Sequence, residues 1–300
     1  MNPIGLLLSV AIGVSLGFFG GGGSILTVPL LVYVFGREPK EAIASSLLIV
    51  AIASCAAALQ HWRAGNVQAR AGLVFGTAGM TGAYLGGRAG GLMDGGVLLL
   101  LFASIMVLTA LAMWRGRRAP AKVEGAEVSN WKLVLQGFTV GCFTGLVGAG
   151  GGFLIVPALV LWAGLSMRAA VGTSLFVIVM NSLAGFLGYI AQVSVDYNLI
   201  VAVAAAAIAG SFLGARLTRH VEPGSLRRVF AGFVLAMALV ILVREASLVA
   251  QAGASALPRT LPQIIFAVLM LGVGVAAGRS SRGAVDPGGY DVSYQEGDGI

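Results

Sequence analysis

Residues 17–29 read GFFGGGGSILTVP, and residues 145–157 read GLVGAGGGFLIVP. Each stretch places a run of residues with little or no side chain inside a long apolar region. A glycine costs about 1 kcal/mol of helix propensity relative to alanine, so several in succession should unwind a helix locally. We therefore expect a helix break in each stretch, with a new short helix starting at Ser24 or Ile25 and at Gly152 or Phe153.

The two stretches belong to a longer internal repeat with a fixed offset of 128 residues. The residues that recur in the first copy are Gly17, Gly20, Gly22, Gly23, Val28, Pro29, Gly36, Ser46, Leu47, Gly82, Leu85, Gly86 and Arg88. Their counterparts are Gly145, Gly148, Gly150, Gly151, Val156, Pro157, Gly164, Ser174, Leu175, Gly210, Leu213, Gly214 and Arg216. One ungapped register over this distance indicates a duplication.

The composition predicts a membrane protein. Of the 300 residues, 58% are apolar and only 10% are charged, and the mean hydropathy is +0.93. Spanning the hydrocarbon core takes about 20 residues of helix. Continuous apolar segments lie at 42–60, 69–87, 97–114, 169–190, 199–217, 226–243 and 261–278, and the glycine-broken regions lie at 4–35 and 133–162.

We predict an all-α polytopic membrane protein with two homologous halves. The first repeat covers 1–114, a polar cytoplasmic linker 115–130 and the second repeat 131–243. Each half contributes a glycine-broken helix pair and three transmembrane helices. Residues 244–278 add a loop and an extra C-terminal helix, and the polar tail 279–300 is expected to be disordered.

Basic residues suggest the topology. If each broken pair enters and leaves on one face, Lys and Arg divide five against fourteen between the two sides. The positive-inside rule then makes the richer side, which includes Arg63, cytoplasmic, and places Arg37 and Lys40 outside. An odd number of crossings per half makes the repeats inverted, the arrangement found in many secondary transporters.

The glycine breaks predict an anion site. Unwound backbone at membrane depth must be covered by protein or face a water-filled cavity, and the N–H groups that start the following helix favour negative charge. Ser24 could cap its half-helix or donate its hydroxyl to a ligand. Close helix packing is the alternative for small residues, and we favour it for the GxxxG spacings. The predicted site residues are Gly20, Gly21, Gly22, Gly23, Ser24, Gly148, Gly150, Gly151 and Gly152.

Small polar residues within the spans complete the predicted site. Those expected to line it are Ser45, Ser46, Thr173, Ser174 and Asn181. For Ser54 and Ser182, a lining role and an interhelical hydrogen bond are equally plausible. Arg88 and Arg216 could attract the anion at the cavity mouths, although anchoring at the membrane surface is the favoured interpretation.

Other classes of function fit less well. The twelve acidic residues lie in loops, at segment ends or in the tail, and only two histidines occur, so we expect no metal site and no cofactor. The basic residues sit in short loops between apolar runs, which argues for a lipid bilayer rather than nucleic acid as the partner. A serine protease acting through Ser24 would need a histidine or lysine deep in a span.

The motifs GFFGGGGSILTVPLL and GLVGAGGGFLIVPALV, each followed by A-x-x-S/T-S-L and later by GxxLGxR, resemble the sulfite exporter TauE/SafE family of membrane permeases. The resemblance covers residues 5–243. It implies a carrier in the bacterial inner membrane that moves small anions such as sulfite, thiosulfate or organosulfonates, usually outward. We expect alternating access, with the two halves rocking around a midplane site. A channel or facilitator for small anionic or neutral solutes is the alternative.

Overall fold

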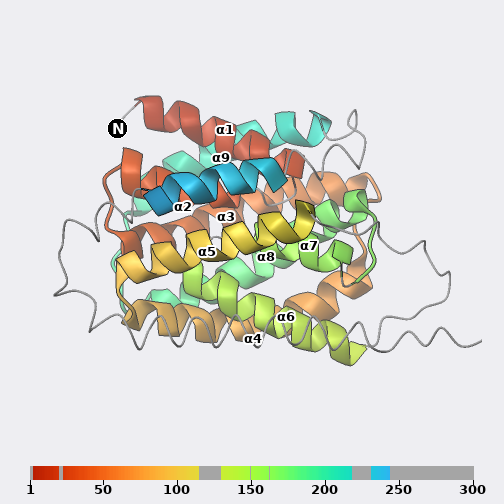
Figure 1. Cartoon of the computed structure of the whole chain (residues 1–300). Helices are drawn as coiled ribbons and strands as arrows, with labels where there is room; N and C mark the ends of the chain where they lie inside the picture. Colours follow the sequence, from red (N-terminus) through yellow and green to blue (C-terminus); the bar gives the residue numbers. More distant parts are fainter. Residues whose placement is uncertain are drawn as a thin grey trace, which may run out of the picture.

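The computed structural model describes residues 3–19, 23–114, 130–148, 150–161, 163–217 and 231–243. The regular elements in these residues are helices, which lie side by side along one common direction (Figure 1). Residues 115–129 of the expected linker, the extra C-terminal helix and the polar tail fall outside the described residues, and Asn130 already belongs to a helix. The all-helical membrane architecture predicted from the composition is confirmed for the part that the structure describes.

Each glycine stretch separates a longer helix from a shorter one. Residues 3–114 form α1 (Pro3–Phe19), α2 (Ser24–Pro29), the π-helix η1 (Leu30–Val34), α3 (Pro39–Arg63), α4 (Ala69–Leu92) and α5 (Gly95–Trp114). Residues 130–217 form α6 (Asn130–Val147), α7 (Gly152–Leu161), α8 (Met167–Tyr189) and α9 (Tyr197–Leu217). A further helix covers Ala231–Val243. The predicted starts of the short helices at Ser24 and Gly152 are confirmed.

Three helices in the described residues, α3, α8 and α9, are long and apolar enough to cross a membrane on their own. Shorter apolar helices accompany them, among them α1 and the combined α2 and η1. Pro29 lies at the junction of α2 and η1. Because proline has no N–H to donate, the regular helical hydrogen bonds are interrupted there, and the wider π turn follows it.

The chain re-enters after the first glycine stretch. At one end of α1, Gly5 packs against the ring of Phe35, which follows η1. At the other end, the Gly17 carbonyl lies 3.4 Å from Nε2 of His61, near the end of α3. Therefore α1 and α3 run in the same direction, and α2 with η1 brings the chain back to the face where α1 began.

The chain also re-enters after the second glycine stretch, as contacts along α4 show. Near the start of α4, Gly72 packs on Thr173 of α8. Near its end, Gly90 packs on both Leu146 of α6 and Tyr189 of α8. The hydroxyl of Tyr189 also donates to the Leu146 carbonyl at 2.6 Å. These contacts make α4, α6 and α8 parallel, so α7 returns the chain between α6 and α8.

Glycines bring two pairs of helices into backbone contact. In the α1–α9 pair, Gly13 packs against the Ala207 carbonyl, and in the α4–α6 pair, Gly141 packs against the Gly79 carbonyl. A Cβ at either glycine would overlap that carbonyl. Such close approach is the known use of small residues in membrane helices. The GxxxG glycines that contact the partner backbone in the same way are Gly82, Gly86, Gly210 and Gly214, which confirms the predicted packing role.

The helices gather into two bundles that meet at a central seam. One bundle contains α1, α3 and α9, the other contains α4, α6 and α8, and α3 packs against α8 between them. In Figure 1, α1 and α9 lie at one edge of the molecule and α4 and α6 at the opposite edge. Fully buried apolar residues line the seam: Ile43, Leu47, Val50, Val171, Leu175 and Ile178. Each bundle thus combines helices from both halves of the sequence.

Candidate functional site

The second glycine stretch is a true helix break. Helix α6 ends at Val147 and α7 begins at Gly152. Between them, Gly148, Gly150 and Gly151 have φ angles of +72°, +60° and +75°. This left-handed region is readily available only to glycine, because a Cβ collides with the backbone there. The expected unwinding is therefore confirmed for this stretch.

The break is packed tightly against α3 and α8. A Cβ at Gly148 would overlap the side chain of Ile43, and a Cβ at Gly150 would lie 2.5 Å from Cγ1 of Val50 and 3.0 Å from Oγ of Ser182. All three glycines are buried. Both the backbone conformation and the lack of space therefore require glycine, and the structure describes a conformation in which α3 and α8 close over the break.

Hydrogen bonds satisfy the Gly148 and Gly151 carbonyls at this break. The Ser46 hydroxyl on α3 lies within hydrogen-bonding distance of two acceptors, the carbonyls of Gly148 and Ile43. The Gly151 carbonyl accepts from the N–H groups of Leu154 and Ile155 at 2.9 and 2.8 Å. The N–H groups of Gly152 and Phe153, which start α7, precede these bonds and have no acceptor within their own helix. The break, which packs on α3 and α8, therefore lies at the positive end of the α7 dipole.

Polar side chains without a partner lie on α3 and α8, and that of Ser182 lies beside this break. Ser182 of α8 is fully buried and its Oγ makes no hydrogen bond. Ser54 of α3, one helical turn beyond Val50, is also fully buried and unpartnered. Asn181 is 1% exposed and neither end of its amide has a partner. It packs on Gly79 of α4 rather than on the break.

The first break is described only from Gly23 onwards. Gly23 has a right-handed φ of −65° and is the N-cap of α2, with no side-chain capping bond. Ser24 is the first helical residue and is fully buried. The predicted capping role of Ser24 is therefore wrong, because its position inside the first turn is one residue too late for an N-cap. Gly20, Gly21 and Gly22 lie outside the described residues. Helix α2 contacts α7, so the two half-helices are neighbours.

The remaining predicted residues divide between the break and the helix ends. Ser45 is buried on α3 beside Ser46. Thr173 lies at the beginning of α8, where its Oγ1 accepts from the Gln68 N–H at 2.9 Å and fixes the α3–α4 loop. Ser174 donates to the Val171 carbonyl of its own helix at 2.8 Å. Two predicted cations, Arg88 and Arg216, are exposed near the ends of α4 and α9, as expected of surface anchors.

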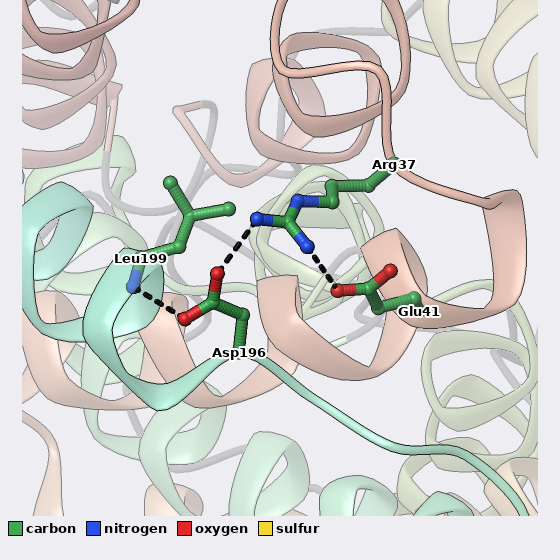
Figure 2. A network of polar contacts seen from close by, with 4 residues as sticks. All are labelled: Arg37, Glu41, Asp196 and Leu199. Carbon is green, nitrogen blue, oxygen red and sulfur yellow. Dashed lines mark hydrogen bonds and ion pairs between the residues drawn. The ribbon is translucent and has the colours of Figure 1, made fainter. Parts of the chain in front are cut away.

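A charged cluster connects the two halves at the face where α1 begins. Arg37, just after η1, forms ion pairs with Glu41 of α3 at 3.1 Å and with Asp196 at 2.6 Å (Figure 2). The other carboxylate oxygen of Asp196 accepts from the Leu199 N–H at 3.1 Å and so caps α9. The sequence gives no sign of this cluster, because Arg37 and Asp196 are 159 residues apart and show no periodic relation.

Comparisons with known proteins agree on one family. The family described as Sulfite exporter TauE/SafE matches residues 5–241. A probable membrane transporter protein of Xylella fastidiosa (strain Temecula1) is 36% identical over 246 residues, covering 80% of this chain and 94% of the relative. The probable membrane transporter protein YdhB of Bacillus subtilis is 30% identical over 217 residues, covering 71% and 89%. A relative in Methanocaldococcus jannaschii, the probable membrane transporter protein MJ0441, is 26% identical over 258 residues, covering 80% and 95%. No solved structure gives a significant match.

Proposed function

This chain belongs to the Sulfite exporter TauE/SafE family and is a multi-pass membrane transporter, and we propose that it exports small sulfur-containing anions across the bacterial inner membrane. Sulfite, thiosulfate and organosulfonates are the proposed substrates. The site is formed by the two glycine breaks, with Ser45, Ser46, Ser174 and neighbouring polar groups around them. The observation that carries the proposal is the left-handed run at Gly148, Gly150 and Gly151, which precedes α7 and packs against the α3–α8 seam through Gly148 and Gly150.

The charges of the lining favour an anion. Backbone N–H groups and serine hydroxyls can donate to an anion, and the helix dipole adds positive potential. The acidic residues in the described part, Glu38, Glu41, Asp94 and Asp196, lie in loops or in the first turn of a helix. A transported cation would therefore meet few negative ligands along the seam, in contrast to the buried carboxylates of many cation carriers.

Several contacts support an inverted repeat. Helix α1 leads into the re-entrant pair in the same direction as α3, whereas α6 runs with α4, which follows α3 by a short loop and so runs back across the molecule. The first helix of each repeat then points the opposite way. Glycine contacts also recur at the 128-residue offset, with Gly13 on Ala207 matched by Gly141 on Gly79. We propose repeats at 1–114 and 131–243, related by a pseudo-two-fold axis in the membrane plane.

The mobile bodies proposed for alternating access are the two bundles, not the two sequence halves. Glycine-mediated backbone contacts in the α1–α9 and α4–α6 pairs join helices of different halves. Rocking one half against the other would break both contacts at once. Sliding α1, α3 and α9 against α4, α6 and α8 would keep them and open the α3–α8 seam on alternate faces. The site between two inverted repeats is where such transporters bind their substrates.

Transport in proteoliposomes tests the proposal. Sulfur-labelled sulfite and thiosulfate should show saturable uptake and counterflow, and Gly150→Leu should abolish both. Gly164→Leu is a matched control, because Gly164 also has a positive φ of +67° but has open space around its Cβ position. Flux that rises linearly with concentration and shows no counterflow would support the channel or facilitator alternative. Equal flux in the Gly150→Leu and unsubstituted proteins would refute the site.

A further inference from the structure

We infer that Ser54 and Ser182 are the side-chain donors that bind the transported anion, one on each side of the α3–α8 seam. The inference rests on the proposed anion transport and adds to it two residues from outside the glycine breaks. It also assigns the substrate class: an oxyanion that accepts several hydrogen bonds at once from neutral donors.

The two hydroxyls differ from most other serines in the helices. A serine within a helix usually donates to a carbonyl three or four residues earlier, as Ser174 does to Val171 and Ser211 does to Ile208, both at 2.8 Å. Ser54 and Ser182 make no such bond although each is fully buried. A buried hydroxyl without a partner is unfavourable. Two such groups at the centre of the molecule indicate donors held ready for a ligand.

Their positions coincide with the proposed site. The Ser182 Oγ lies 3.0 Å from the Cβ position of Gly150, at the same level of the seam as Val50. Ser54 follows Val50 by one turn on the same face of α3. An anion that enters when the bundles separate would therefore meet the Ser182 hydroxyl and the N–H groups that begin α7.

The internal repeat connects the two serines. Ser54 and Ser182 are themselves separated by the 128-residue offset, so they occupy equivalent positions in the two halves. Val50 and Ile178 are equivalent in the same way and are both fully buried in the seam. The pseudo-two-fold axis proposed above would pass between these residues, which gives one hydroxyl to each of the two bundles that move.

The chemistry separates this site from a cation site. A serine hydroxyl alone could coordinate a metal ion through its oxygen or donate its O–H to an anion. Here the hydroxyl of Ser182 lies beside the N-terminal end of a ten-residue helix, α7, where cations are repelled and negative charge is stabilised. An oxyanion offers a separate oxygen to each donor, so it can satisfy the hydroxyl and the backbone N–H groups together.

The test compares Ser182→Ala with Ser211→Ala. Loss of the unpartnered hydroxyl should raise the unfolding temperature of the ligand-free protein in detergent or leave it unchanged, and should raise the KM for anion flux about tenfold or more. Ser54→Ala should behave in the same way. Ser182→Cys keeps a side chain of the same shape, slightly larger, but is a weak donor, so it should show the raised KM with normal folding. Ser211→Ala should lower the unfolding temperature slightly and keep the KM.

Two results would overturn the inference, and they are distinguishable. Lower thermal stability with an unchanged KM in Ser182→Ala and Ser182→Cys would show that the hydroxyl is structural. The second readout is the thermal shift of the unsubstituted protein with sulfite, thiosulfate, sulfate and chloride. If none of these anions stabilises or is transported by the unsubstituted protein, the proposed anion transport fails and the assignment of both serines fails with it.

Discussion

Arg37 and Asp196, from opposite halves of the sequence, form an ion pair in which the Arg37 Nη2 lies 2.6 Å from the Asp196 Oδ2. The pair links the end of the first re-entrant segment to the start of α9. The pKa of Asp196 is lowered, chiefly by the hydrogen bond from the Leu199 N–H and also by the Arg37 guanidinium.

We expect this lowered pKa to make the stability of the folded protein depend on pH in the acidic range. A carboxyl group with a depressed folded pKa stabilises the protein above its unfolded pKa of about 3.9, and that contribution is lost as the pH falls through the folded value. Asp196→Asn should therefore remove part of the fall in unfolding temperature between about pH 5 and pH 3. Glu38→Gln, at an exposed carboxylate in the loop before α3, should not. The same acid dependence in both variants would contradict the assignment.

Gly150→Ala should be more destabilising than Gly65→Ala. Both positions have positive φ, +60° and +70°, so each alanine carries a backbone cost of about 1–2 kcal/mol. Only Gly150 adds an overlap with Val50, since nothing lies within 4 Å of the Gly65 Cβ position. That overlap should cost a further ~1–3 kcal/mol. Thermal unfolding in detergent measures both.

The matched rescue for this prediction is the double variant Gly150→Ala with Val50→Ala. Removal of Cγ1 from Val50 relieves the overlap but carries a cavity cost of its own, so the double variant should lose less stability than the sum of the two single variants. Full additivity of the two substitutions would show that Gly150 and Val50 are not in contact in solution.

Gly141→Ala should destabilise the α4–α6 crossing by about 1–3 kcal/mol, because its Cβ would displace the Gly79 backbone. Gly232→Ala is the control, since its Cβ would meet no atom within 4 Å. Alanine also favours a helix over glycine, so the control should be neutral or slightly more stable. Equal losses in the two variants would mean that the crossing is not held by backbone contact.

Tyr189→Phe should cost about 1 kcal/mol, because it leaves the Leu146 carbonyl without the hydroxyl that donates to it at 2.6 Å. Tyr84→Phe provides the comparison: Tyr84 is on α4 and is 40% exposed. We expect the difference to appear in the unfolding temperature. If Tyr84→Phe is the more harmful change, the α6–α8 contact at Tyr189 is not important for stability.

Cysteine labelling tests the topology. Arg37→Cys and Arg63→Cys, introduced with the native Cys55 and Cys142 replaced by alanine, should react with a membrane-impermeant maleimide from opposite faces of the membrane. Arg37 lies at the face where α1 begins, and Arg63 ends α3 on the other. In right-side-out vesicles only Arg37→Cys should be labelled. Labelling of both from one side would refute the re-entrant arrangement.

The helix breaks and the glycine crossings could be predicted from the sequence because both depend on local chemistry. A run such as Gly150-Gly151-Gly152 weakens a helix wherever it occurs, and GxxxG spacing leaves a groove on any helix. The 128-residue offset made the position of one break predict the other. These features need no knowledge of which helices become neighbours.

The partners of those features could not be predicted. That α1 packs on α9, or that Gly150 meets Val50 and Ser182, depends on tertiary arrangement over long sequence separations. The contact of Thr173 with the Gln68 loop is subject to the same limit, because the two residues are 105 positions apart. The sequence does carry one long-range signal: Ser54 and Ser182 share the repeat offset, whereas Ser9 has glycine at the equivalent position, Gly137.

The interleaved packing has a consequence for biosynthesis. Helix α1 leaves the ribosome well before α9, which supplies the carbonyls that pack on the glycines of α1. Helix α4 is likewise made before its partner α6. In a nascent chain that stops after α5, the glycine surfaces of α1 and α4 are therefore exposed to lipid. Folding is complete only when α6 and α9, which are made later, pack against α4 and α1. Quality control by membrane proteases should accordingly eliminate truncated products, and separately expressed halves should accumulate only when both are made in the same cell.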